Sequence, residues 1–306
     1  MLFFFLFLLL GEAIDLVKSQ QLPTDIFILA GQSNMAGRGG VVINPYTGNL
    51  TWDGIVPPES QPNPSILRLS AQLNWVLAQE PLHADIDYNK INGVGPGMAF
   101  ANAILKKEPR IGAVGLVPCA IGGTNISQWG KGGFLYEELV RRTKEALKSG
   151  GVVRAMLWYQ GESDTKDGEE TEFYEERLTN FFTEIRADLN HPLLRIIHVG
   201  LASGEGPFIE EIREAQLGIK LQNVANVDAR GLQLEADRLH LTTAAQVHLG
   251  QLLADALLHF PSIFIPNPIQ TTNVFCLSNT SSYHYFLFLI SIYLLSLLLF
   301  FFKKVF

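Results

Sequence analysis

The chain has 306 residues, of which 47% are hydrophobic and 17% are charged, and its formal net charge is -7 at pH 7. This length suits one large α/β domain or two small ones. The negative charge, without a basic stripe, argues against nucleic acid as a partner. Two cysteines predict no disulfide framework, and the seven histidines lack metal-ligand spacing, so we expect neither a metal nor another cofactor.

The chain begins with ten apolar residues, Met1 to Leu10, which are followed by Gly11-Glu12-Ala13. An apolar segment before a small-x-small triplet is typical of a secretory signal peptide, although no basic residue precedes it here. The apolar segment is too short to span a bilayer. We therefore predict a signal peptide over residues 1–13, with a retained membrane anchor as the alternative.

Between Leu22 and Phe260, short apolar runs alternate with amphipathic segments. The runs are rich in Val, Ile and Leu and are apolar on both faces, as in buried parallel strands. Strands are predicted at 25–30, 111–118, 152–159, 194–200 and 224–228. Helices are predicted at 134–149, at 171–189 and after Thr242. This alternation predicts one α/β domain at 22–260, with a doubly wound parallel sheet of about five strands and helices on both faces.

The stretch from Gly39 to Gly97 interrupts this alternation, because it is rich in Pro, Gly and Asn. It contains a candidate hairpin at 66–69 and 75–77. Loops of this length inside compact domains usually have a function. Since the stretch begins just past Ser33, we expect it to form a wall of an active site. A surface excursion without function is the alternative.

Beyond the domain, residues 261–284 are rich in Pro, Asn, Thr and Ser, which predicts a stalk or linker. Residues 285–302 form a nearly continuous apolar run, long enough for a transmembrane helix. Lys303 and Lys304 suit a cytoplasmic tail at 303–306. We therefore predict a single-pass type I membrane protein of the secretory pathway (endoplasmic reticulum, Golgi or cell surface). A GPI-anchored or a secreted form is the alternative.

Two motifs contain the residue types of a serine hydrolase. The segment 31–35, GQSNM, follows the first predicted strand, and the segment 237–240, DRLH, follows the last. A hydroxyl (Ser33), an imidazole that takes its proton (His240) and a carboxylate that orients the imidazole (Asp237) form a catalytic triad. In open α/β sheets, reactive groups gather at the carboxyl ends of the strands. An ordinary turn serine and a solvated Asp/His pair are the alternatives.

The serine motif is not the Gly-x-Ser-x-Gly elbow of α/β-hydrolases, because Met35 occupies the place of the second glycine. Two further strand ends offer donors for the oxyanion that forms during ester hydrolysis. The second strand leads into Gly122-Gly123-Thr124, where glycine allows a close backbone approach, and the third leads into the segment 158–164, WYQGESD. Each could be an ordinary turn, but four polar motifs at four strand ends favour a reaction centre.

These four motifs, with Trp129 after the glycine turn, resemble those of the SGNH hydrolase superfamily. They are most similar to its sialate O-acetylesterase-like branch, and within it to the plant carbohydrate esterases. Gln32 and Gln160 stand where the wider superfamily has Asp and Asn, and both replacements are typical of this branch. The resemblance covers residues 22–260. It implies a flavodoxin-like three-layer α/β/α fold and an enzyme that removes acetyl groups from sugars.

The resemblance also implies roles for individual residues. Ser33 is the expected nucleophile, His240 the general base and Asp237 its orienting carboxylate. The expected oxyanion hole consists of the backbone N–H groups of Ser33 and Gly122 with the side chain of Gln160, and the sequence does not decide between Gly122 and Gly123. Substrate contacts are expected from Gln32, Asn34, Gly123 and Glu162.

We therefore predict a serine esterase that removes acetyl groups from carbohydrate through an acyl-enzyme. A lipid or thioester hydrolase of the same fold is one alternative, since the fold does not determine the substrate, and it would need a broad apolar acyl pocket. A carbohydrate-binding protein without catalysis is another, which intact Ser33, Asp237 and His240 disfavour. The polysaccharide, the acetyl position and the oligomeric state are left open by the sequence.

Overall fold

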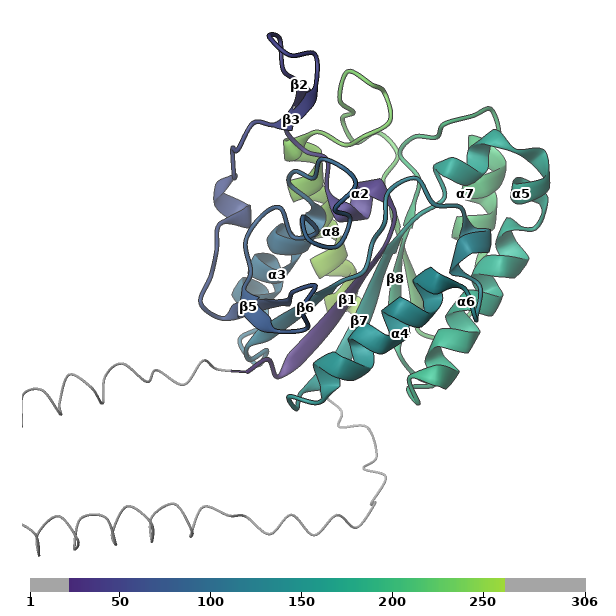
Figure 1. The fold of residues 1–306 in the computed structure, drawn as a ribbon. Coiled ribbons are helices and arrows are strands. Elements are labelled where there is room, and N and C mark those ends of the chain that lie inside the picture. Colours follow the sequence, from purple (N-terminus) through teal and green to yellow (C-terminus); the bar gives the residue numbers. More distant parts are fainter. Residues whose placement is uncertain (1–21, 262–306) are drawn as a thin grey trace, which may run out of the picture. The chain divides into compact units, whose positions relative to one another are not determined.

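The computed structural model describes residues 22–261, and a seven-stranded sheet runs through this part of the chain (Figure 1). Its order is β5-β4-β6-β1-β7-β8-β9. The bounds are Asp25–Gly31 for β1, Ile66–Leu69 for β4, Trp75–Leu77 for β5, Val114–Pro118 for β6, Val152–Tyr159 for β7, Arg195–Gly200 for β8 and Val224–Asp228 for β9. Every neighbouring pair is parallel except β4 and β5, which are antiparallel.

The helices lie on both faces of the sheet, which gives three layers (Figure 1). Helices α3 and α8 cover one face, and α4, α6 and α7 cover the other. Their bounds are Pro96–Lys107 for α3, Phe134–Leu147 for α4, Tyr174–Asp188 for α6, Ile209–Gly218 for α7 and Thr243–His259 for α8. The three-layer α/β prediction is confirmed.

The five predicted strands are all present, and they appear in the order second, first, third, fourth, fifth. This is the flavodoxin-like order, in which the direction of winding reverses beside the first strand. All seven residues of β1 are buried, because β6 and β7 flank it and helices cover both faces. Ligands of such sheets bind at the carboxyl ends of the strands near this reversal. A ligand site is therefore expected at the residues that follow β1 and β7.

The sheet is wider than the predicted five strands. The candidate hairpin forms, as β4 and β5, but it extends the edge of the main sheet, where β4 pairs in parallel with β6. The rest of the 39–97 stretch holds a small hairpin and one 3-10 turn. These elements are β2 (Val41–Ile43), β3 (Leu50–Trp52) and η1 (Pro58–Ser60).

Two helices, α3 and α7, have no clear sequence signal. Small residues make up much of α3, and most of its first half is buried. Acidic residues dominate the start of α7. The predicted helix at 171–189 is divided at Phe173 into α5 (Gly168–Glu172) and α6. The short elements α2 (Ser33–Ala36), η2 (Ile126–Trp129) and η3 (Ser163–Lys166) follow β1, β6 and β7.

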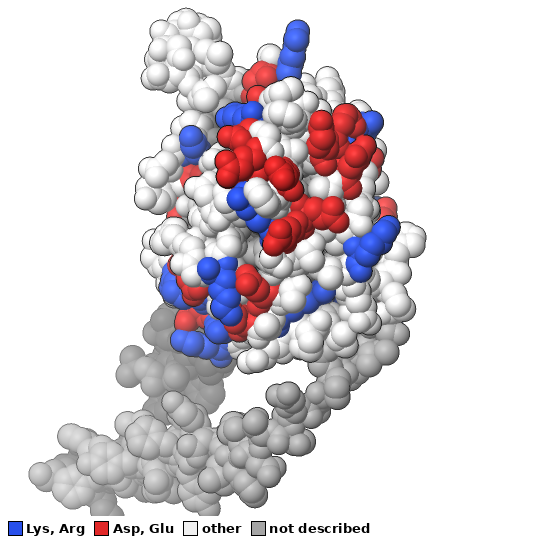
Figure 2. Space-filling model, turned by 90° about the vertical axis from the view of Figure 1, so that its right-hand side faces the viewer, with Lys and Arg blue, Asp and Glu red and all other residues white. Residues whose placement is uncertain are grey.

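Acidic side chains gather on the side of the molecule that α5, α6 and α7 form (Figure 2). Each of these helices has two glutamates in its first turn, at positions 169–170, 175–176 and 210–211. Negative charge near a helix N-terminus is favourable because it interacts with the unpaired N–H groups and the helix dipole. Lysine and arginine side chains lie among the acids on this face (Figure 2). We interpret it as a solvated surface that stabilises the helix starts.

The predicted signal peptide at 1–13, transmembrane helix at 285–302 and tail at 303–306 lie outside the described residues, as does all but the first residue of the predicted stalk at 261–284. Within residues 22–261, no helix has the length and apolar character needed to cross a membrane.

Close packing of α3 against α8 depends on Gly250. A Cβ atom at this position would lie 2.5 Å from the carbonyl oxygen of Pro96 and 2.8 Å from the Cβ of Ala99. Alanine normally stabilises a helix interior relative to glycine by about 1 kcal/mol. Here we expect Gly250→Ala to lower the free energy of unfolding by about 1–3 kcal/mol, because backbone must move to admit the methyl group. Urea denaturation measures this.

Gly218→Ala is the matched control, because a Cβ at this last residue of α7 would meet no atom within 4 Å. We expect its stability to equal or exceed that of the unchanged protein. A Gly250→Ala protein that is as stable as the control would contradict the close α3–α8 contact.

Candidate active site

The end of β1 places Ser33 at the carboxyl edge of the sheet. Gly31 has a φ of 128°, and a Cβ there would lie 2.0 Å from the carbonyl oxygen of Tyr159 in β7, so only glycine fits. The chain then turns through Gln32 into α2, which begins at Ser33. This strand-to-helix turn holds Ser33 at the reversal point of the sheet, where its side chain faces the segment that precedes α8.

Ser33, His240 and Asp237 form a hydrogen-bonded chain. Ser33 Oγ lies 3.0 Å from His240 Nε2, and His240 Nδ1 lies 2.7 Å from Asp237 Oδ2. The other carboxylate oxygen, Oδ1, accepts from the backbone N–H groups of Leu239 (2.9 Å) and His240 (3.0 Å). Burial favours the protonated acid, but these N–H groups and the imidazole hold the pKa of Asp237 below its usual value. An ionised Asp237 keeps a proton on Nδ1 and leaves Nε2 free to accept from Ser33.

Asn34 holds the His240 segment against the end of β1. Its Nδ2 donates to the carbonyl oxygen of Leu239 (3.3 Å) and to Glu162 Oε1 (2.7 Å). Its Oδ1 accepts from the backbone N–H of Leu241 (2.9 Å), so the amide binds the chain on both sides of His240. Asn34 is fully buried. The structure therefore places Asn34 beneath the Ser33–His240–Asp237 cluster and not on the wall of the pocket at Ser33.

Two further residues expected to contact substrate, Gln32 and Glu162, are also buried behind the pocket. Gln32 and Glu162 are at most 1% exposed. Gln32 Oε1 accepts from the backbone N–H groups of Gly161 (3.3 Å) and Ser163 (3.4 Å). These side chains join the ends of β1 and β7 behind the site. Of the four residues expected to contact substrate, only Gly123 lines the pocket at Ser33.

Gln160 does not point into that pocket. It is completely buried, and its Nε2 donates to the carbonyl oxygen of Thr124 (2.8 Å) and to Asp164 Oδ2 (2.5 Å). Both amide hydrogens thus have acceptors inside the protein. The expected role as a side-chain oxyanion donor does not fit this arrangement, because a free N–H would have to face the reacting ester.

Of the two glycines after β6, Gly122 lies against Ser33. A Cβ at Gly122 would be 3.4 Å from the Cβ of Ser33 and 2.6 Å from Arg38 Nη2. Gly123 has a φ of 74° and no atom within 4 Å of such a Cβ. The backbone N–H groups of Ser33 and Gly122 have no acceptor among residues 22–261.

The pocket at Ser33 has a volume of about 290 Å³. Part of its wall comes from the 39–97 stretch, as predicted. The residues that line the pocket besides the candidate triad and the two glycines are Arg38, Val41, Leu50, Lys90, Ile91, Glu205, Glu235 and Leu239. Apart from Leu239, which stands in the 237–240 motif, sequence reasoning does not find these side chains, because they come from five separate segments and stand in no motif.

Arg38 forms the most buried ion pair of this region. Its Nη2 lies 2.5 Å from Asp87 Oδ2, and its Nη1 donates to Asn92 Oδ1 (2.7 Å) and to the carbonyl oxygen of Gly37 (2.9 Å). Arg38 and Asp87 are 6% and 3% exposed. This pair attaches the loop around residue 87 to the segment after α2. No group of three or more His, Cys, Asp and Glu side chains within residues 22–261 is arranged to hold a metal ion.

A flavodoxin-like sheet with a Ser–His–Asp cluster at its reversal point is the architecture of a carboxylic ester hydrolase of the SGNH type. The chain belongs to the family of carbohydrate esterases described as sialic acid-specific acetylesterases, whose family model matches residues 23–259. The resemblance inferred from the motifs is thereby confirmed.

One relative comes from Arabidopsis thaliana, and both its sequence and its solved structure are similar to this chain. The chain is 55% identical over 249 residues to a protein described as a probable carbohydrate esterase, covering 81% of this chain and 95% of that protein. The X-ray structure of the same Arabidopsis protein has 56% identity and a TM-score of 0.75, covering 77% of this chain and 98% of that one. The crystal structure of a carbohydrate acetylesterase from Xanthomonas citri has 19% identity and a TM-score of 0.52, covering 77% of this chain and 56% of that one. It shows the shared fold alone.

Two buried carboxyl groups behind the site give its stability a pH dependence. Burial raises the pKa of Glu162 from 4.5 to about 7, although the Asn34 amide opposes this. Burial likewise raises the pKa of Asp164 from 3.8 to about 7, against hydrogen bonds from Ile126 and Gln160. The folded protein therefore keeps protons that the unfolded chain releases, and stability is lost as the pH rises through the folded-state pKa.

We expect Glu162 by itself to lower the free energy of unfolding by on the order of 3 kcal/mol as the pH rises from about 4.5 to about 7. Glu162→Gln stays neutral, and its oxygen can still accept from Asn34, so it should flatten part of this fall. Urea denaturation at several pH values measures the slope. Glu211→Gln, on the exposed side of α7, is the control and should keep the original slope. An unchanged slope in Glu162→Gln would contradict the raised pKa.

Proposed function

We propose that the protein hydrolyses O-acetyl and other short acyl esters on carbohydrate, with Ser33 as nucleophile, His240 as general base and Asp237 as the orienting carboxylate. The observation that carries this proposal is the continuous hydrogen-bonded chain from Ser33 Oγ through both ring nitrogens of His240 to Asp237. The family assignment supports a carbohydrate ester as substrate.

In the first step, Ser33 Oγ bonds to the carbonyl carbon while its proton moves to His240 Nε2. Collapse of the tetrahedral intermediate breaks the bond to the sugar oxygen, which takes the proton from His240 and leaves as a free hydroxyl. A water molecule then gives a proton to His240 and attacks the acyl-enzyme. Acetate leaves, and the proton returns to Ser33 Oγ. Asp237 stabilises the imidazolium that forms in each half of the reaction.

The oxyanion would be bound by the backbone N–H groups of Ser33 and Gly122. Both groups are without acceptors among residues 22–261, and a Cβ at Gly122 would be in contact with the Cβ of Ser33. One such donor typically stabilises the transition state by about 3 kcal/mol. In this proposal Gln160 supports the site from behind, because both of its amide hydrogens have protein acceptors.

The pocket supports a short acyl group. Its volume is about 290 Å³, and charged side chains such as Glu205 and Glu235 line it beside Val41 and Leu50. A long lipid chain would have to pass these charged groups, and their desolvation costs free energy. A purely binding function is opposed by the intact chain of hydrogen bonds from Ser33 to Asp237.

Replacing the candidate nucleophile or base should abolish turnover of a short-chain aryl acetate. We expect Ser33→Ala and His240→Ala each to lower kcat by roughly 10⁴-fold, with a double variant no worse than the single ones. Asp237→Asn should also be severe, because it favours the wrong imidazole tautomer. Steady-state kinetics measures these losses, with circular dichroism to check the fold.

Ser65→Ala is the matched control, because Ser65 directly precedes the amino end of β4, at the opposite edge of the sheet. It should retain the activity of the unchanged protein. A folded Ser33→Ala protein with more than about a tenth of that activity would rule out this nucleophile.

We also propose that the chain enters the secretory pathway through the leader at 1–13 and is held in the membrane by the apolar segment at 285–302. The length and apolar character of that sequence support this. Full-length protein should remain in the membrane pellet after alkaline carbonate extraction, whereas a chain that ends after Pro261 should be soluble in the secreted fraction. Full-length protein that washes off would contradict the spanning helix and favour a secreted form.

A further inference from the structure

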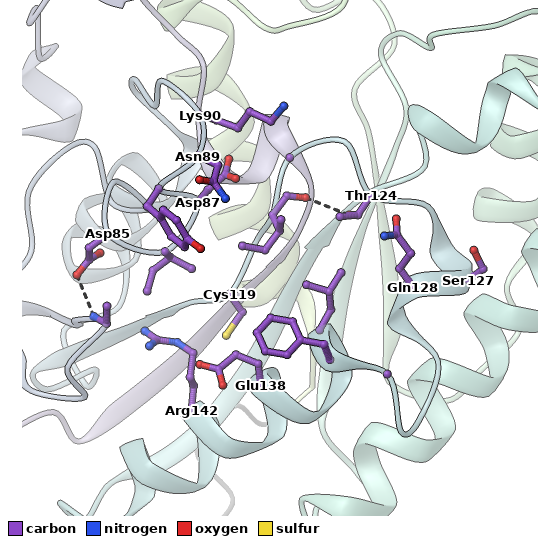
Figure 3. A pocket seen from close by; sticks show the side chains of 18 residues that line it. Asp85, Asp87, Asn89, Lys90, Cys119, Thr124, Ser127, Gln128, Glu138 and Arg142 are labelled. Carbon is purple, nitrogen blue, oxygen red and sulfur yellow. Dashed lines mark hydrogen bonds between the residues drawn. The ribbon is translucent and has the colours of Figure 1, made fainter.

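A second cavity of about 720 Å³ adjoins the pocket at Ser33 (Figure 3). We call it the α4 groove, because its walls are the 85–90 loop, the residues after β6 from 119 to 128, and the start of α4 from 133 to 142. Lys90 and Gly122 line both the α4 groove and the Ser33 pocket. A ligand bound at Ser33 can therefore extend into the α4 groove without leaving the protein surface.

Two aromatic side chains are left exposed in the α4 groove. Tyr88, in the 85–90 loop, is 75% exposed, and Phe134, the first residue of α4, is 79% exposed. Apolar side chains that stay uncovered in a concave surface commonly mark a binding site. These two come from different walls of the groove, so a flat ligand in the groove could cover either ring.

The interior of the α4 groove is apolar and its edges are polar. Ile121 and Cys119 contribute to the interior, and burial raises the pKa of the Cys119 thiol to about 11, so it stays uncharged. Asn89 and Lys90 lie on one side and Gln128 on the other (Figure 3). Within residues 22–261, neither the Asn89 side chain nor Nε2 of Gln128 has a hydrogen-bond partner. Planar amides can donate to and accept from hydroxyl groups.

Most charges in the α4 groove are already neutralised by protein partners. Asp85 pairs with Arg68 (2.6 Å), Glu138 pairs with Arg141 (2.6 Å), and Asp87 pairs with Arg38. The buried Arg142 donates to the carbonyl oxygens of Leu69, Ser70 and Pro118. The three carboxylates of the α4 groove are thus paired and the Arg142 cation is buried, which leaves Lys90 as an exposed charge at the edge of a groove that otherwise suits an uncharged ligand.

We propose that the α4 groove binds the sugar residues next to the acetylated one, so that the substrate is an acetylated oligosaccharide or polysaccharide chain. Sugars combine a flat apolar face, which can cover an aromatic ring, with a rim of hydroxyl groups, which can bind amides. A long acyl chain fits less well, because rings that are 75% and 79% exposed would leave it largely in water. This inference rests on the proposed function of Ser33, since the α4 groove extends from that pocket.

Direct binding tests the α4 groove independently of catalysis. The probes are unacetylated xylo-oligosaccharides and cello-oligosaccharides of increasing length, titrated calorimetrically into full-length Ser33→Ala protein. We expect affinity to rise with chain length. Phe134→Ala or Tyr88→Ala, added to Ser33→Ala, should weaken binding of the longest chain by about tenfold, which corresponds to about 1.4 kcal/mol. Tyr46→Ala is the matched control, because Tyr46 is 94% exposed and lines neither cavity. Equal affinity for all lengths, or unchanged binding by Phe134→Ala, would overturn the proposal.

Kinetics separates this inference from the proposed function. For the unchanged protein and Tyr46→Ala, kcat/KM on acetylated oligosaccharides should rise with chain length, and in Phe134→Ala this rise should shrink. Hydrolysis of acetates at a rate independent of sugar chain length would refute the α4 groove and leave the esterase intact. Binding that depends on chain length, without hydrolysis of any acetate, would support the α4 groove and refute the proposed esterase. If Phe134→Ala instead changes the preference between acetyl and longer acyl esters, the groove is an acyl pocket and our proposal is wrong.

Discussion

One buried side chain joins the two parts of the candidate reaction centre, which are 207 residues apart in the sequence. The Asn34 amide binds backbone groups on both sides of His240 and also Glu162, without exposure to solvent. A fully buried amide with these partners has one favourable orientation, because turning it would break several hydrogen bonds at once. The imidazole is therefore positioned by α2, directly after the central strand, and the geometry at Ser33 depends on this constraint.

The polar layer behind the pocket explains how the sheet supports that geometry. Gly31 allows β1 to approach the carbonyl oxygen of Tyr159, and Gln32 and Gln160 then connect the two strand ends through hydrogen bonds. Buried polar groups cost free energy unless they are paired, and the hydrogen bonds of a paired network hold its members in one arrangement. The polar residues of this layer, such as Gln32 and Gln160, therefore support the candidate reacting groups and do not themselves face the pocket.

The 39–97 stretch contributes both to the main sheet and to the wall of the Ser33 pocket. Its β4–β5 hairpin widens the sheet, while its β2–β3 hairpin and the loop around residue 90 line the Ser33 pocket. The Arg38–Asp87 and Arg68–Asp85 ion pairs attach this loop to the core. Because the loop is anchored at both pairs, it can line both the Ser33 pocket and the α4 groove with little regular structure of its own.

Much of this architecture is determined by the sequence alone. Apolar runs predict the five central strands, because burial on both faces requires apolar residues throughout. The motifs at 31–35 and 237–240 predict Ser33, His240 and Asp237 as the candidate triad, since the proposed chemistry demands these residue types. The orientation of Gln32, Asn34 and Gln160 was decided only by the tertiary structure: a polar residue at a strand end has the same sequence signature whether it faces a ligand or another strand. The same holds for Tyr88 and Phe134, whose common groove arises from packing between distant segments, for which local periodicity carries no signal.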